Sequence, residues 1–202
     1  MTGCRHVTSV PCVFPDFTPR PHLVAAAAAP HEALVAAAAD HLDALVPCEG
    51  WTVRDLAEHM LTWTPVLAGA GRGAPPEPGS PSLEGDWTAE LGKDRDDLVA
   101  VWSDPTSWQG TTTMTSSELP SPVVGTMTFC ELVLHGWDLA RGLGRTVTWD
   151  DALLEEAHEA LSQLTPLGRQ MGAFGPAVVI APDAPLLDRV VAVAGRDPAW
   201  RP

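Results

Sequence analysis

The chain has 202 residues, 45% of them hydrophobic, which fits one domain with a sizeable core. Its formal net charge is -14, with 26 acidic against 12 basic residues, and the basic residues form no continuous run. This balance argues against nucleic acid or an anionic membrane surface as a partner.

The first 21 residues contain no continuous apolar stretch of the kind found in a secretory signal. The longest low-charge stretch, residues 23–39, is interrupted by Pro30, His31 and Glu32, so it does not resemble a membrane span. None of the four cysteines forms a CxxC pair. We therefore expect a cytoplasmic protein with reduced cysteines. The abundance of Ala, Pro, Gly and Arg indicates a high-GC bacterial genome.

The N-terminal half predicts a tail followed by helices. Residues 1–19 hold three prolines and no periodicity, so we predict an irregular tail, with a single domain over 20–202. An Ala- and Leu-rich pattern predicts a helix over 21–46, with a kink near Pro30. A second helix is expected over 52–68, where Thr52 caps the start and Asp55 completes a capping box. We expect the helix to be ended by three glycines: Gly69, Gly71 and Gly73.

The remaining elements continue the same pattern. Helices are predicted over 88–102, 123–143, 150–164 and 184–194. The Thr- and Ser-rich segment 106–122 predicts a long loop with a short extended piece, and one hypothesis is that it covers a functional site. Because almost no period-2 alternation occurs, the fold class we expect is all-α, a helical bundle.

The helix over 123–143 contains the most informative residues. Its segment 129–140 is apolar on every side, as in a buried helix, yet Glu131, His135 and Asp138 interrupt it. Their spacing of four and three residues aligns them on one face. A buried carboxylate without a partner costs several kcal/mol. Glu131 and His135 therefore either bind a cation between them or form a hydrogen-bonded pair.

A third candidate ligand comes from the helix over 52–68. Leu56, His59, Trp63 and Val66 form a core-facing seam, and His59 stands where a bundle favours an aliphatic residue. Two histidines and one carboxylate match a facial triad or a zinc site with an open position. The alternative is that His59 is a core histidine whose hydrogen bonds are satisfied.

Other polar residues near this cluster have more than one interpretation. Asp138 is a fourth ligand, an anchor for a ligand imidazole, or an ion-pair partner of Arg141, with the last two favoured. Gly136, in mid-helix, indicates the close approach of another helix or a ligand. His31 has no spacing that suggests a site.

Two motifs resemble a known family. Segment 48–59, CEGWTVRDLAEH, and segment 131–141, ELVLHGWDLAR, are similar to paired motifs of the DinB-like superfamily of metal-binding four-helix bundles. The branch that they resemble is related to the N-terminal domain of mycothiol-dependent maleylpyruvate isomerase. Segments 183–189 and 195–198 also fit its C-terminal end, so the likeness spans roughly residues 20–200.

The resemblance carries several expectations. It implies an up-down four-helix bundle with long crossover loops and extra C-terminal helices. It implies one divalent metal ion bound by His59, Glu131 and His135. Zinc is the favoured metal, with nickel, iron and manganese as alternatives. It also implies mycothiol or another low-molecular-weight thiol as co-substrate, a small electrophile as substrate, and a possible homodimer. Asp138 and Arg141 are expected to contact the thiol or the substrate.

Three hypotheses of function follow. The first is a metal-dependent thiol S-transferase or thiol-assisted isomerase, in which metal-bound thiolate attacks an electrophile. The second is a metal-dependent hydrolase that uses metal-bound water. The third is a non-enzymatic metal-binding or stress-response module, because a fold alone does not decide function.

Overall fold

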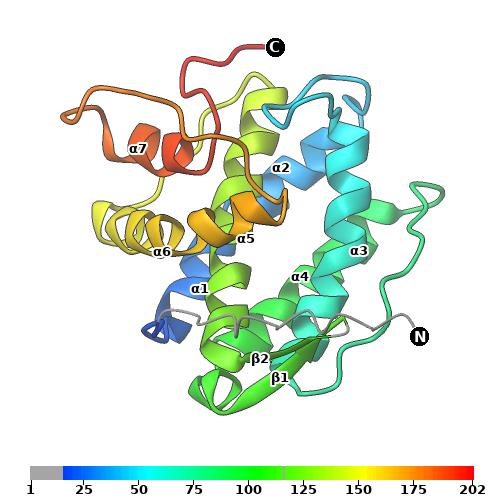
Figure 1. The fold of residues 1–202 in the computed structure, drawn as a ribbon. Coiled ribbons are helices and arrows are strands. Elements are labelled where there is room, and N and C mark those ends of the chain that lie inside the picture. The colour runs from blue at the N-terminus through cyan, green and yellow to red at the C-terminus, as the bar shows by residue number, and fades with distance from the viewer. Residues whose placement is uncertain (1–15, 116) are drawn as a thin grey trace, which may run out of the picture.

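The computed structural model describes residues 16–115 and 117–202, and their fold is an all-α bundle (Figure 1). Helix α5 (Ser121–Gly142) runs through the middle of the molecule and contacts the bundle helices over 21–28, 31–38 and 53–71. The bundle consists of α1 (Pro21–Ala28), α2 (His31–Ala38), α3 (Val53–Gly71), α4 (Trp87–Trp102) and α5 (Ser121–Gly142). Helices α6 (Asp151–Gln170) and α7 (Leu186–Val193) pack beside it. The predicted bundle with extra C-terminal helices is confirmed.

The first predicted helix is two short helices instead of one kinked helix. Helix α1 ends at Ala28, α2 begins at His31, and α2 ends at Ala38 rather than Val46. Pro30 separates them because proline has no N–H to donate and its ring clashes with the carbonyl four residues earlier. The predicted tail lies mostly outside the described residues, and residues 16–20 have no regular secondary structure.

Helix α3 begins where the sequence predicts and ends later. The Thr52 hydroxyl accepts a bond from the Asp55 N–H, and Asp55 Oδ2 accepts one from the Thr52 N–H at 2.7 Å, which confirms the capping box. Helix α3 ends at Gly71, and Gly73 follows with a positive φ of 74°, so the prediction of a glycine-rich helix end is confirmed at these two positions. Gly69 lies inside the last turn instead. A Cβ on Gly69 would lie 2.6 Å from Pro76 and one on Gly71 would lie 2.5 Å from Val101 on α4, so both glycines also permit close packing.

The predicted loop 106–122 contains regular structure. A 3-10 turn, Pro105–Trp108, precedes a hairpin of β1 (Thr111–Met114) and β2 (Ser117–Pro120), with Thr112 opposite Leu119. The Thr112 hydroxyl donates to the carbonyl of Ala70 at 2.6 Å. Ala70 lies about 16 Å along α3 from His59, at 1.5 Å per residue. The hairpin therefore packs at the other end of the bundle, and the hypothesis that it covers the His59 cluster is wrong.

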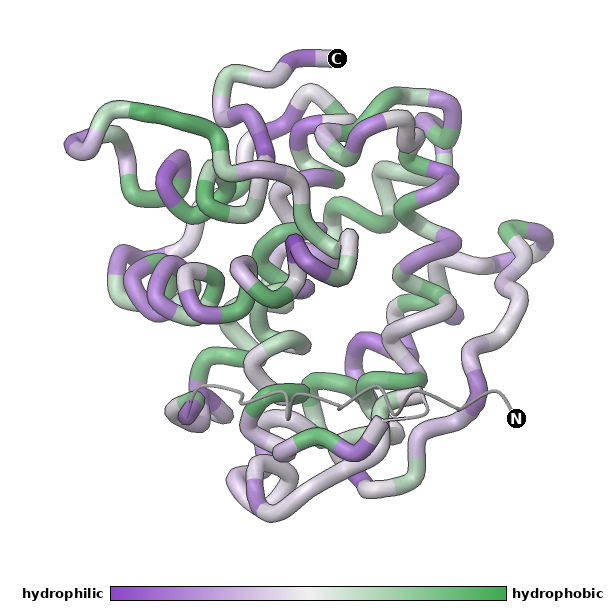
Figure 2. The backbone as a smooth tube through the Cα atoms, viewed as in Figure 1, coloured by the Kyte–Doolittle hydropathy of each residue, from purple (hydrophilic) through white to green (hydrophobic). Residues whose placement is uncertain are grey.

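The core gathers around α5, where 18 residues are buried. Within residues 129–140, every residue except Glu131 is buried, so the prediction of a helix buried on all sides is confirmed. Figure 2 shows a continuous hydrophobic stretch elsewhere, in the connection between α6 and α7, where Val179 is 96% exposed. In the part of the chain that the structure describes, no helix is both long and apolar enough to cross a membrane.

Candidate metal centre

The structure brings together the three residues that the sequence singled out as ligands. His59 projects from α3, and Glu131 and His135 from successive turns of α5. Glu131 Oε2 lies 3.3 Å from His59 Nε2 and 2.9 Å from His135 Nε2. The two imidazole rings meet edge to face, with centroids 4.8 Å apart. Glu131 thus has two nitrogen partners from two different helices.

This donor set fits a divalent metal ion. The three donor atoms lie within 4.8 Å of one another. In a tetrahedral zinc site with ligand distances near 2.0–2.1 Å, donor atoms are about 3.3 Å apart, so small side-chain movements would complete such a site. The side chains of His59 and Glu131 are 25% and 36% exposed, so solvent reaches one side of the cluster.

Asp138 lies behind His135 and fixes its imidazole. The Nδ1–H of His135 donates to Asp138 Oδ2 at 3.0 Å, and the Asp138 side chain is 0% exposed. With Nδ1 engaged, Nε2 is the nitrogen that faces Glu131, and in the neutral ring it carries the lone pair that a metal needs. Carboxylates commonly hold metal-binding histidines in this way. The structure therefore places Asp138 as an anchor of the imidazole, without exposed surface for a ligand.

Arg196 holds Asp138 in turn. Its Nη2 lies 3.0 Å from Asp138 Oδ2, and its Nε lies 3.3 Å from Oδ1, so both carboxylate oxygens bind the guanidinium. The Cys48 thiol donates to the same Oδ2 at 3.3 Å. Sequence reasoning did not assign Arg196 a role, although it lies in the matching segment 195–198. Its separation of 58 residues from Asp138 hides this contact from any helical spacing.

The charges of these residues stabilise one another. Burial alone would raise the pKa of Glu131, but His135 and His59 bring it well below its usual range. Burial would lower the pKa of His135, yet the charge of Glu131 and the hydrogen bond to Asp138 raise it well above 6.5. Burial also opposes ionisation of Asp138, but Arg196 and His135 lower its pKa to about 2. The cluster therefore supports charged carboxylates inside a largely buried helix.

A second set of donors shares His135. Cys48, His135 and Asp138 also lie within 4.8 Å of one another. However, Arg196 Nη2 is 3.0 Å from Asp138 Oδ2 and 3.7 Å from the Cys48 sulfur. A permanent positive charge at this distance disfavours a cation at the same donors. The set with His59 and Glu131 is therefore the better cation site.

Arg141 does not pair with Asp138. Its Nη2 donates to the carbonyl of Pro198 at 2.6 Å, and its guanidinium lies 5.2 Å from the centre of the Trp137 ring. The suggested ion pair between Asp138 and Arg141 is replaced by the pair with Arg196. Contact between Arg141 and a thiol or a substrate stays a prediction.

Two tryptophans flank the open side of the cluster. The ring of Trp51 lies 5.3 Å from that of His59, and the ring of Trp63 lies 6.5 Å from it. Both side chains are partly exposed. They give the surroundings of His59 an apolar character beside the charged Glu131.

Comparisons with known proteins identify a family that matches most of the bundle. The sequence profile described as "Mycothiol maleylpyruvate isomerase N-terminal domain" matches residues 24–140, which is more than half of the chain. That range includes His59, Glu131, His135 and Asp138, whereas Arg196 lies beyond it. No curated protein is a significant match.

Two solved structures resemble the fold. A crystal structure of a histidine-to-alanine mutant of the mycothiol-dependent maleylpyruvate isomerase matches with a TM-score of 0.55 and 15% identity, over 81% of this chain and 75% of that one. A second crystal structure of that isomerase has a TM-score of 0.47, with the same identity and coverage. The first match shows a shared DinB-like fold at low sequence identity.

Proposed function

Because the chain belongs to the mycothiol maleylpyruvate isomerase N-terminal domain family, we propose that it is a divalent-metal-dependent enzyme that uses a mycothiol-type thiol. The reaction is S-transfer to a small electrophile, or its thiol-assisted isomerisation. The names of the two similar structures describe a mycothiol-dependent isomerase. The substrate class and the thiol are extended from those names to this chain as a proposal.

One observation carries the proposal. Three donor atoms of the types that zinc prefers converge from α3 and α5, with Glu131 Oε2 at 3.3 Å from His59 Nε2 and 2.9 Å from His135 Nε2. Three protein ligands leave a coordination position for an exogenous group, as in catalytic rather than structural zinc sites. Solvent access beside Glu131 and His59 supplies the path to that position.

The chemistry divides between the ion and the chain. A divalent cation, when bound, lowers the pKa of a coordinated thiol so that thiolate is present at neutral pH. The chain's own residues orient the metal-binding imidazole and surround the site with apolar side chains. Asp138 keeps the Nδ1 proton on His135, so Nε2 keeps its direction. Trp51 and Trp63 form apolar walls on which the body of an electrophile can pack.

The test is thiol consumption by the purified protein with zinc, a low-molecular-weight thiol and a panel of small electrophiles. We expect loss of thiol with at least one electrophile, abolished by a chelator and by His59→Ala. His22→Ala is the matched control, because His22 is exposed on α1 and belongs to neither donor set. Thiol loss that is equal with and without metal, or in His59→Ala and the native protein, would contradict the proposal.

A second experiment separates thiol chemistry from hydrolysis by metal-bound water. In cobalt-substituted protein, a thiol that binds the ion changes the visible spectrum, because sulfur enters the coordination sphere. We expect a saturable spectral change when the thiol is added. An unchanged spectrum, with ester or amide cleavage by the same preparation, would support a hydrolase and overturn the thiol proposal.

A further inference from the structure

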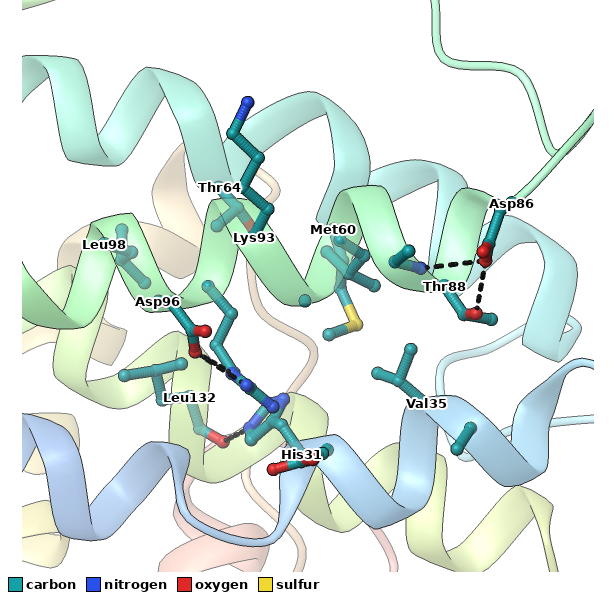
Figure 3. Close-up of a pocket in the computed structure, with 16 residues that line it drawn as sticks. His31, Val35, Met60, Thr64, Asp86, Thr88, Lys93, Asp96, Leu98 and Leu132 are labelled. Carbon is teal, nitrogen blue, oxygen red and sulfur yellow. Dashed lines mark hydrogen bonds and ion pairs between the residues drawn. The ribbon is translucent and has the colours of Figure 1, made fainter.

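A cavity of about 520 Å³ lies among α2, α3, α4 and α5 (Figure 3). Helices α2 and α4 supply most of its walls. Met60 and Leu132 line it, and they directly follow His59 and Glu131 in the sequence. Successive residues of a helix point about 100° apart. The cavity is therefore next to the metal centre but shares no donor residue with it.

The interior of the cavity is apolar apart from one histidine. Val35, Leu91, Leu98 and Leu132 line it and are each at most 6% exposed. Among them lies His31, which is 2% exposed. A cavity of this size with apolar walls and one fixed polar group has the ordinary character of a small-molecule site.

His31 has one ring nitrogen in use and one free. Its Nε2 lies 2.8 Å from the carbonyl oxygen of Leu132, and because a carbonyl only accepts, Nε2 carries the hydrogen. Among the described residues, none bonds to Nδ1, which is buried. Burial lowers the pKa of His31 to about 4, and the charges of His135 and Arg95 add to this effect. In the neutral ring, Nδ1 is an acceptor that needs a donor.

Gly92 on α4 provides an independent indication. A mid-helix glycine costs about 1 kcal/mol relative to alanine. The other helical glycines of the described residues have neighbours so close that an added Cβ would come nearer than ordinary van der Waals contact. They are Gly69, Gly71, Gly125, Gly136, Gly142 and Gly168. A Cβ on Gly92 would meet nothing within 4 Å, and Gly92 lines the cavity. Packing does not require this glycine, and the absence of a side chain here leaves space at the cavity wall.

The cavity lining includes three acidic residues, Glu32, Asp86 and Asp96, and two basic residues, Lys93 and Arg95, and none of the five is buried. Arg95 binds Asp96 at 2.6 Å, and Asp86 caps α4 by accepting from the N–H of Ala89 at 3.1 Å. Glu32 and Lys93 add one exposed charge of each sign. Because the charged groups lie at the exposed rim and the buried walls carry none, the chemistry of the interior suits a neutral molecule.

We propose that this cavity binds a small, neutral, largely apolar molecule that donates one hydrogen bond to Nδ1 of His31, which becomes accessible when neighbouring side chains shift. Phenols and other hydroxylated aromatic compounds have this chemistry. The site is separate from the candidate metal centre, and the proposal does not depend on the thiol chemistry proposed above.

The test compares two probes of nearly equal shape on the full-length protein. 2-Naphthol has a hydroxyl donor, and 2-methylnaphthalene has a methyl group in its place. We expect saturable binding of 2-naphthol, about tenfold tighter than that of 2-methylnaphthalene, because one hydrogen bond separates them. Long-range proton–nitrogen NMR spectra should show that 2-naphthol shifts the Nδ1 resonance of His31 and that 2-methylnaphthalene does not.

Three variants assign the binding to this cavity. His31→Gln keeps a donor for the Leu132 carbonyl but lacks the ring acceptor, so the preference for 2-naphthol should disappear. Gly92→Phe should abolish binding of both probes by filling the cavity, while Gly92→Ala, the matched control, should retain it. Circular dichroism checks that each variant is folded. The proposal is overturned if folded native protein binds neither probe, if both bind equally, or if Gly92→Phe binds as the native protein does.

Discussion

The two faces of α5 each hold a buried histidine from the bundle, and the surroundings shift the two pKa values in opposite directions. His135 is 8% exposed and lies between Glu131 and Asp138, which raise its pKa. His31 is 2% exposed, packs against the other face, and bonds only a backbone carbonyl, so its pKa is about 4. Burial is similar in both cases. The neighbouring carboxylates account for the difference. We call the side with Glu131, His135 and Asp138 the charged face, and the side with His31 the neutral face.

The two faces also differ in what fixes them. Gly136 lets His31 approach α5, because a Cβ there would lie 3.1 Å from His31 Nε2. This confirms the expectation that Gly136 marks a close approach, here by another helix. The charged face is fixed instead by a residue distant in sequence, Arg196, which follows the end of α7 and binds Asp138. Substitutions on the two faces should therefore weaken stability or metal binding for different physical reasons.

The largest expected effect is on the charged face. Asp138→Asn should lower the free energy of unfolding of the metal-free protein by about 3–5 kcal/mol, because it leaves the buried Arg196 guanidinium without its counter-charge. Asp96→Asn is the control. Asp96 is 71% exposed and pairs with Arg95 at the surface, so its loss should cost about 1 kcal/mol or less. Urea unfolding measures both, and equal effects would contradict the account of the buried pair.

The neutral face predicts a pH dependence. The pKa of His31 is about 4 in the folded protein against 6.5 as the ordinary value, so the unfolded chain binds more protons between these values. Stability should therefore fall as pH falls from 6.5 to 4, by up to about 3 kcal/mol from this residue. His31→Gln should remove this part of the slope. Denaturation at several pH values measures it, and an identical slope in both proteins would show that His31 is not buried neutral.

Arg196 links the charged face to metal binding. Arg196→Met removes the group that holds Asp138, so His135 loses its orientation, and metal affinity should fall about 10–100-fold. Arg196→Lys should recover part of the loss, because it restores the charge without the bidentate geometry. Arg141→Met is the control, since Arg141 bonds Pro198 and not Asp138. Competition with a chelator measures the affinities. Equal losses of metal affinity in the Arg141 and Arg196 variants would contradict the role assigned to Arg196.

The smallest effect compares two glycines. Gly92→Ala should raise the free energy of unfolding by about 1 kcal/mol, because alanine favours the helix and the new methyl meets no neighbour. Gly136→Ala should instead destabilise the protein, since its methyl would press on His31 and Trp149. Thermal unfolding distinguishes the two, and a loss of stability in Gly92→Ala would mean that this wall is closely packed.

Local signals in the sequence predicted the elements that carry the charged face. The Thr52–Asp55 capping box and the period of α5 depend on residues within a few positions of one another, so they are visible in one dimension. The same periods aligned Glu131 with His135 and marked His59 as exceptional. The break at Pro30 was expected as a kink only, because the sequence does not reveal what each half of that helix packs against.

Long-range contacts account for what was missed. Arg196 reaches Asp138 across 58 residues, and His31 reaches Leu132 across 101, so neither pair follows any local spacing. The packing of residues 74–76 against Gly69, and of Val101 on α4 against Gly71, likewise cannot be inferred from the residues next to these glycines in the sequence. In each case the deciding atom belongs to another element, and only the folded chain brings it near.

The most direct test of the central claim is the metal content of the native protein measured beside His59→Ala, with His22→Ala as the control. Both are purified in parallel and analysed for divalent metals. We predict about one ion per chain in the native protein and in His22→Ala, and almost none in His59→Ala, because two remaining ligands hold zinc weakly. Equal metal content in His59→Ala and the native protein would contradict a metal site formed by His59, Glu131 and His135.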